Sequence, residues 1–225
     1  MGNIQLGSPF VPIRPVPAKT PIRRQEASEE RREAILAVGL AVFSADGFAA
    51  AKLDDAATKA GVAKGRIYLH FRDRQDLFEQ IVRGAMEPII EQLERVAELP
   101  DLPTDALLAK LFELFQSQVL TTDRRFVIRL VLTEGVHFPE IASFYHREVV
   151  SRGLALLKMN TNCGTARDEV APTDLAYFPH LFFAPLAMDV MWDGLFSAFE
   201  PIDIGRLLSA HRQTLLGNAG RGSNA

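Results

Sequence analysis

The sequence predicts an all-α protein built in two parts. Apolar residues recur at spacings of three and four along most of the 225 residues, and no segment shows the alternating pattern of a β-strand. Helix start and stop signals divide the chain into about nine helices. Near the amino-terminal end two of these helices are very short and are joined by a glycine-containing turn, whereas most of those that follow are long.

The first short helix is identified by its apolar stripe. Its members Leu53, Ala56, Ala57 and Ala60 fall at i, i+3, i+4 and i+7, which predicts a helix of about two turns. Two aspartates follow Leu53 directly, where the positive end of the helix dipole favours acids. Gly61 comes after the last periodic residue and is expected to end the helix in the left-handed conformation.

The second short helix is expected from about Lys64 to His70. Ile67 and Phe71, four residues apart, turn inward, and the basic side chains remain on the opposite side. Two short helices around a glycine turn, with a basic outer face, form the helix-turn-helix arrangement, whose second helix enters the DNA major groove. The alternative is an ordinary corner between two helices of a bundle.

The surrounding sequence resembles a known family over residues 28–83. A helix, Gly-Phe, a short helix, Ala-Gly-Val-Ala-Lys-Gly-Arg-Ile-Tyr-Leu-His-Phe and then Arg-Asp-Arg-Gln-Asp-Leu-Phe closely resemble the amino-terminal domain of the tetracycline-repressor (TetR) family. Lys52, Ala63, Arg66 and Leu69 depart from the residues usual in that family. These departures bear on the DNA sequence that is recognised and not on the fold.

The resemblance implies an amino-terminal three-helix, helix-turn-helix DNA-binding domain and a carboxy-terminal helical domain for ligand binding and dimerisation. It also implies that a long connector helix carries the ligand signal to the DNA-binding helices. The expected segments are an extended, basic, proline-rich arm over residues 1–26, the DNA-binding domain over 27–75, the second domain over 76–219 and a tail over 220–225. The arm is either inert or a further DNA contact.

Helix signals set the expected element bounds. Ser28 starts a helix that ends near Asp46, and Asp73 caps the connector, which reaches about Glu98 and should be kinked at Pro88. The remaining helices are expected at about 106–120, 124–135, 140–157, 172–199 and 203–216, with a loop over 160–171.

Composition restricts the class of protein. The chain is 48% hydrophobic and 24% charged, as in an ordinary soluble protein, and no apolar run approaches the length of a membrane span. No secretory signal is recognisable at the start, and the single Cys163 fits a reducing compartment, so a cytoplasmic protein with no membrane contact is expected. Residues 1–83 carry a net charge of +3 and residues 84–225 carry −6, so positive charge is concentrated where DNA would bind.

The predicted DNA-binding residues lie on and beside the second short helix. Lys64 and Arg66 are long donors that can reach guanine O6 and N7, and Tyr68 and His70 suit phosphate oxygens, as their family counterparts do. Lys52 and Arg74 are expected to hold the DNA backbone on either side. For each basic residue the alternative is a solvated surface charge. The full set is Lys52, Ala63, Lys64, Gly65, Arg66, Tyr68, His70 and Arg74.

A small hydrophobic effector is expected to bind in the second domain. Aromatic residues and methionines there exceed what a tight bundle needs, and a mostly apolar cavity suits an apolar ligand, although each of these residues taken singly is more often plain core. The inducer pocket itself is implied mainly by the family resemblance. The candidate lining residues are Met86, Ile90, Phe112, Phe115, Leu130, Glu134, Phe144, Tyr145, Phe178, Phe182, Met188 and Trp192.

A homodimer is expected through the last two helices. The helix near residues 181–196 is apolar nearly all round, which is more than one core contact needs. A two-fold dimer would bury the excess and place two recognition helices on one side of a palindromic operator. The candidate interface residues are Phe183, Leu186, Met191, Leu195, Phe196, Leu207 and His211.

Catalytic and metal sites are not indicated. The five histidines show no metal-ligand spacing, and the chain has no phosphate-binding glycine loop and no nucleophile elbow. No cofactor is expected. The sequence therefore predicts a ligand-responsive transcriptional regulator that is not an enzyme, most simply a repressor. The alternative is a helical small-molecule-binding protein or enzyme that uses the helix-turn-helix only as scaffold, and an activator differs from a repressor only in operator position.

Overall fold

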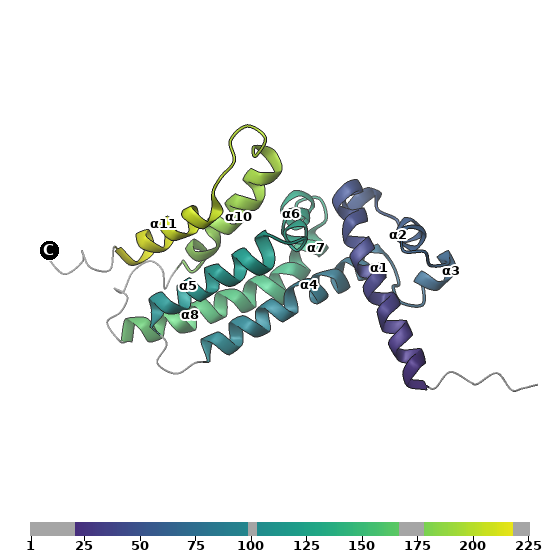
Figure 1. The fold of residues 1–225 in the computed structure, drawn as a ribbon, viewed down its shortest axis with the longest axis horizontal. Coiled ribbons are helices and arrows are strands. Elements are labelled where there is room, and N and C mark those ends of the chain that lie inside the picture. The colour runs from purple at the N-terminus through teal and green to yellow at the C-terminus, as the bar shows by residue number, and fades with distance from the viewer. Residues whose placement is uncertain (1–20, 99–102, 167–177, 218–225) are drawn as a thin grey trace, which may run out of the picture.

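The fold was analysed in a computed structural model that describes residues 21–98, 103–166 and 178–217. Every regular element in these ranges is helical, which confirms the predicted all-α class. Figure 1 shows two parts: α1, α2 and α3 at one end, and a bundle of the remaining helices, with α4 passing from the first part into the second. The elements are α1 (Pro21–Ala50), α2 (Leu53–Lys59), α3 (Lys64–Ile67), α4 (Arg74–Ala97), α5 (Thr104–Phe115), η1 (Gln116–Leu120), α6 (Arg125–Glu134), α7 (Pro139–Tyr145), η2 (His146–Val150), α8 (Ser151–Ala166), α10 (His180–Leu195) and α11 (Ile204–Gly217).

Several predicted local signals are confirmed. Gly47 has φ 75° and breaks α1, and Gly61 has φ 66° after α2, so both glycines take conformations that other residues adopt only with strain. The Asp73 carboxylate accepts a hydrogen bond from the Asp76 N–H at 2.8 Å and so caps α4.

Other predicted bounds were wrong. Helix α3 ends at Ile67, and the three residues after it form turns, because Leu69 and His70 donate backbone hydrogen bonds three residues back. Residues 160–166, expected in a loop, continue α8; the rest of that predicted loop lies outside the described residues. Helix α10 stops at Leu195 and not near Phe199, and α1 begins before Ser28. Two π-helical turns, η1 and η2, continue α5 and α7 and had no sequence signal.

The two parts share one apolar core. Phe48 at the end of α1 lies against Phe78 of α4, with ring centroids 5.8 Å apart, and against Phe138 before α7, at 4.9 Å. Phe78 in turn meets the Phe144 ring edge-on at 6.5 Å. This aromatic junction (Phe48, Phe78, Phe138 and Phe144) joins the amino-terminal helices to the bundle without a gap.

An ion-pair network holds α8 on the connector helix. The Arg152 guanidinium donates to Glu87 at 2.8 Å and to Glu94 at 2.9 Å, and both carboxylates belong to α4. These hydrogen bonds, first that to Glu87, raise the pKa of Arg152. Because all three side chains are partly exposed, the network contributes orientation more than stability.

One described helix is long and apolar enough, by length and composition alone, to be compared with a membrane span. It covers Glu29–Ala50 within α1, which the sequence reading did not single out. Ile35, Val42 and Phe43 of this helix are buried in the protein core, whereas only 28% of its most apolar stretch is buried.

Replacing Gly61 with alanine should destabilise the protein by about 1–2 kcal/mol, because a Cβ at positive φ collides with its own backbone. Urea denaturation followed by circular dichroism measures the change. Gly65→Ala is the matched control: Gly65 is helical, and a Cβ there would meet nothing within 4 Å. Equal stability of Gly61→Ala and the parent would contradict the assigned turn.

Candidate functional site

The outer face of α3 is held in place by two buried side chains. Ile67 is fully buried and Phe71 is 1% exposed, and both enter the core beneath α2 and α3. Val62 closes the corner by donating its N–H to the Ala57 carbonyl at 2.9 Å. Since four residues cannot form a stable helix alone, this packing fixes the direction of α3.

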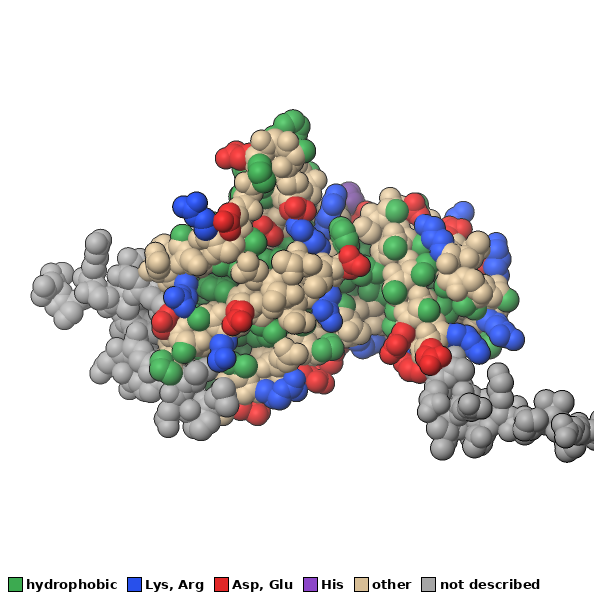
Figure 2. All heavy atoms as spheres, viewed as in Figure 1, with side chains coloured by type: hydrophobic (Ala, Val, Ile, Leu, Met, Phe, Trp, Pro, Cys, Tyr) green, Lys and Arg blue, Asp and Glu red, His purple; other side chains and the backbone are tan. Residues whose placement is uncertain are grey.

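The predicted DNA-binding residues of α3 point outward. The four residues from Ala63 to Arg66 are exposed, as is Tyr68, whereas His70 is half-buried. Lys52 is exposed just before α2 and makes no cap. In Figure 2, Lys and Arg side chains gather at the end of the molecule that carries α2 and α3.

One carboxylate ties the two short helices together across this face. The Tyr68 hydroxyl donates to Asp54 Oδ1 at 3.3 Å, and Lys64 Nζ lies 3.3 Å from Asp54 Oδ2. The charge of Asp54 raises the pKa of Tyr68, so the phenol remains protonated and can donate. Asp54 therefore positions two side chains that were both predicted to contact DNA.

Two further exposed cations, on the segments that flank α3, were not predicted. Lys59 is exposed at the end of α2, and the Arg72 side chain is 83% exposed just after Phe71. Their spacing from Ile67 and Phe71 could have identified them, since residues next to inward-facing positions around a corner face outward. The basic surface is thus broader than the sequence reading proposed.

Arg74 does not have the role expected from the sequence. Its guanidinium donates to the backbone carbonyls of Phe48 and Ala49, and it lies 4.7 Å from the Phe48 ring centroid and 5.4 Å from that of Phe138. The cation is engaged inside the junction between the two parts. It is a structural contact and not a free phosphate clamp.

Arg74→Ala should therefore lower the free energy of unfolding by about 1–3 kcal/mol, because two backbone carbonyls at the end of α1 lose a charged donor and two rings lose a cation. Arg72→Ala, which removes an exposed arginine from the same loop, should change it by less than about 0.5 kcal/mol. Urea melts of both variants test the pair. An Arg74→Ala protein as stable as the parent would contradict the structural role and leave Arg74 among the predicted DNA-binding residues.

Two apolar cavities lie inside the bundle. We call cavity A the space of about 20 Å³ lined from α4, α5, α8 and α10. Cavity B is the space of about 110 Å³ lined from α4, α5, α6, α7, η2, α8 and α10. Cavity A is lined by Leu93, Ala97, Leu107, Leu111, Phe112, Phe115, Gly153, Leu156, Leu157, Phe182, Phe183 and Leu186. Cavity B is lined by Ile90, Leu93, Phe115, Ile128, Tyr145, Val149, Val150, Gly153, Phe183, Leu186 and Ala187.

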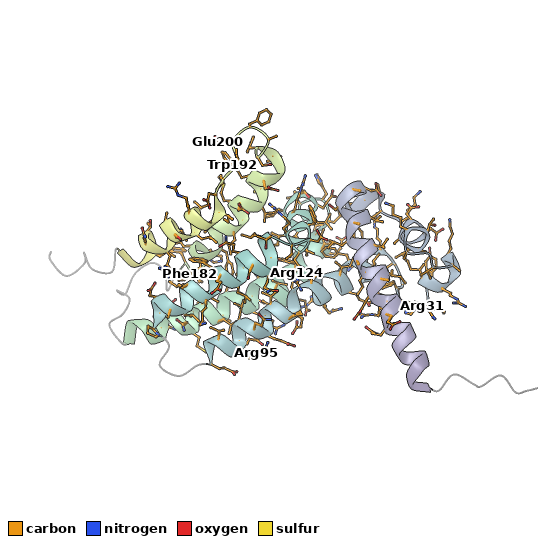
Figure 3. The ribbon with its side chains drawn as sticks, in the orientation of Figure 1. Arg31, Arg95, Arg124, Phe182, Trp192 and Glu200 are labelled. Atoms are coloured by element: carbon orange, nitrogen blue, oxygen red, sulfur yellow. The ribbon has the colours of Figure 1, made fainter. Side chains whose placement is uncertain are left out.

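Five of the predicted effector-binding residues line these cavities. Phe112, Phe115 and Phe182 line cavity A, and Ile90, Phe115 and Tyr145 line cavity B. In Figure 3 the labelled Phe182 lies on the side of α10 that faces the bundle. Gly153 and Phe183 were missed as cavity residues, the glycine because it has no side chain for an apolar pattern to detect.

The structure places the other predicted effector-binding residues elsewhere. Three are plain core, two are exposed, and two have specific contacts outside the cavities. The core residues are Met86, Leu130 and Phe144, and the exposed ones are Phe178 and Met188. Trp192 donates its indole N–H to the Glu200 carbonyl at 2.6 Å, and both residues lie at the far end of α10 in Figure 3. Glu134 ends α6 against Gly47: a Cβ on that glycine would lie 2.9 Å from Glu134 Oε1.

The predicted dimer-interface residues are likewise partly exposed and partly buried. Met191, Leu195 and Phe196 are exposed by 46–60%. Leu186 is buried and lines both cavities, and half-buried Phe183 does so too, so these two side chains face the bundle interior in the single chain. Leu207 and His211 are half-buried, and His211 Nε2 lies 2.8 Å from the Leu181 carbonyl, which ties α11 to α10.

An exposed apolar stripe remains along α10. Leu181, Met188, Met191 and Leu195 are separated by seven, three and four residues, which is the repeat of a helix seam, and each is at least 41% exposed. We call these four residues the α10 stripe. Among the described residues, no group of three or more His, Cys, Asp or Glu side chains is arranged to hold a metal ion.

Comparison with known proteins agrees with this architecture. The sequence model of the family described as bacterial regulatory proteins, tetR family, matches residues 35–81. The HTH-type transcriptional regulator AcrR of Shigella flexneri is 37% identical over 120 residues, which are 53% of this chain and 55% of that protein. The HTH-type transcriptional repressor BepR of Brucella suis is 41% identical over 68 residues, 30% of this chain and 32% of that protein. The chain thus aligns with about half the length of the first relative and less of the second.

The whole fold is shared with solved structures. The transcriptional regulator FadR from Bacillus subtilis, in complex with stearoyl-CoA, superposes with a TM-score of 0.67 at 19% identity, covering 82% of this chain and 97% of that one. This likeness covers more of the chain than the alignment with either sequence relative does.

Proposed function

We propose that this chain, whose residues 35–81 match the sequence model of the tetR family of bacterial regulatory proteins, is a ligand-responsive transcriptional regulator, most simply a repressor. It would bind a palindromic operator as a homodimer in the cytoplasm. The observation that carries the proposal is the exposed face of α3, where Ala63–Arg66 and Tyr68 stand clear of the protein on a helix fixed by buried Ile67 and Phe71. A helix so presented fits the DNA major groove.

The effector part of the proposal is supported by the cavities. Both are lined almost wholly by apolar side chains, and they lie against α4, which also carries Phe78 of the aromatic junction. B. subtilis FadR, similar in fold, holds an acyl-CoA. A ligand that binds one arrangement of α4 better than another would shift the population of DNA-competent dimers.

Lys64→Ala should weaken binding to the intergenic DNA beside the protein's own gene by about tenfold, since a charge-assisted contact contributes on the order of 1–3 kcal/mol. Fluorescence anisotropy at two salt concentrations, with competitor DNA, measures it. Tyr68→Ala should act in the same direction. Lys110→Ala, which removes an exposed lysine from α5, is the charge-matched control and should bind like the parent.

Parent affinity that is weak and insensitive to salt would contradict DNA binding and favour the scaffold alternative, because phosphate contacts make affinity fall steeply with salt. Equal losses in Lys64→Ala and Lys110→Ala would attribute the effect to net charge and not to α3.

Leu195→Glu should convert a dimer into a monomer by placing a charge in the α10 stripe, which the proposed two-fold contact would bury. Sedimentation velocity of the full chain checks the mass. Val136→Glu is the control, because Val136 is 82% exposed in the turn after α6 and is not a member of the stripe. A parent chain that sediments as a monomer, or a Leu195→Glu variant that remains dimeric, would remove α10 from the proposed interface.

A further inference from the structure

Cavities A and B have one boundary in common. Five residues line both, namely Leu93, Phe115, Gly153, Phe183 and Leu186. Spaces that share so many walls are neighbours, and the side chains between them decide whether they act as two sites or one.

The Phe183 ring is the movable part of that boundary. It meets Phe115 edge-on, with ring centroids 5.6 Å apart and an interplanar angle of 76°. On its other side it rests on the bare backbone of Gly153, where a Cβ would lie 3.1 Å from Phe183 Cζ. Phe183 is half-buried and carries no polar atom, so no hydrogen bond holds the ring where it stands.

The lining has a single polar side-chain group. Every lining residue of both cavities is Leu, Ile, Val, Ala, Phe or Gly except Tyr145, which stands in cavity B. Burial raises the pKa of Tyr145, so its hydroxyl stays neutral and can donate one hydrogen bond. No lining side chain could neutralise a charged group inside.

We propose that cavities A and B are the two halves of one elongated channel, that Phe183 is the gate between them, and that the channel takes an unbranched apolar chain bearing one neutral hydrogen-bonding group beside Tyr145. The inference rests on the proposed function in taking this channel as the effector site. It adds the shape and chemical class of the effector and the residue that limits its length.

The cavity volumes determine the ligand chain length above which the position of the Phe183 ring affects binding. Cavity B, at about 110 Å³, is smaller than the roughly 150 Å³ apolar cavity that accommodates benzene. Cavity A adds only about 20 Å³, so a short chain fits in cavity B alone, whereas a longer chain must displace the Phe183 ring and widen cavity A as it enters. Gly153 is what allows that displacement, because any side chain at this position would fill the passage.

The test is calorimetric titration of the full chain with primary alcohols from 1-butanol to 1-dodecanol. In the parent, affinity should keep rising beyond the length that fills cavity B, by roughly threefold to fourfold per methylene while the chain remains buried. Phe183→Leu should bind the eight- to twelve-carbon alcohols several-fold more tightly and 1-butanol about equally. Gly153→Ala should weaken the long alcohols selectively, since its methyl narrows the passage.

Phe182→Leu is the matched control, because it truncates the neighbouring phenylalanine, which lines cavity A alone. Phe182→Leu should alter the affinity for long alcohols. It should not reproduce the selective tightening expected of Phe183→Leu or the selective weakening expected of Gly153→Ala. Tyr145→Phe should weaken all lengths alike by removing the one hydrogen bond.

Separate outcomes bear on the channel and on regulation. Affinity that levels off at short chains in every variant, or no binding by any alcohol, overturns the channel even if another compound releases DNA. The expected chain-length profile without any release of DNA supports the channel and refutes the effector part of the proposed function.

Discussion

The structure depends on a constraint of length: the helix that faces outward at the candidate DNA surface has four residues and cannot maintain its geometry alone. Its orientation is set from below by Ile67 and Phe71, and these residues belong to the same core as Phe78 on the connector helix. Any movement of the connector must therefore reach α3 through packed side chains, because the core between Phe78 and α3 is close-packed.

The aromatic junction extends that constraint into the bundle. Phe48 meets Phe78 and Phe138, and the Arg74 guanidinium lies over the Phe48 and Phe138 rings while donating to carbonyls at the end of α1. The same connector carries Leu93, which lines both cavities. One helix thus contacts the outward-facing unit at one end and the apolar cavities at the other, which is the arrangement that ligand-responsive DNA binding requires.

Features that depend on a few neighbouring residues could be predicted from the sequence, whereas contacts between residues far apart in the chain could not. The short helix pair, the end of the first helix near Asp46, the left-handed Gly61 and the Asp73 cap were all predicted, because each depends on a few neighbouring residues. Arg74 was misassigned because its partners lie 25 and 26 residues away, and no local pattern reports them. The cavity was only partly predicted for a similar reason: an apolar periodicity identifies buried residues but does not distinguish those beside a void from those in close contact.

Asp54 has an effect on selectivity that follows from its position. Its carboxylate already neutralises Lys64 and accepts from Tyr68, so a phosphate that approaches these groups must displace an internal anion. Non-specific DNA offers only phosphates to Lys64 and Tyr68, so the replacement of the Asp54 carboxylate by a phosphate yields little net attraction. A cognate sequence also offers base edges to α3, and these contacts are added in full. In the proposed complex with DNA, an acid placed within a basic surface in this way would weaken non-specific binding more than specific binding and so shorten the time that the protein spends on non-cognate DNA.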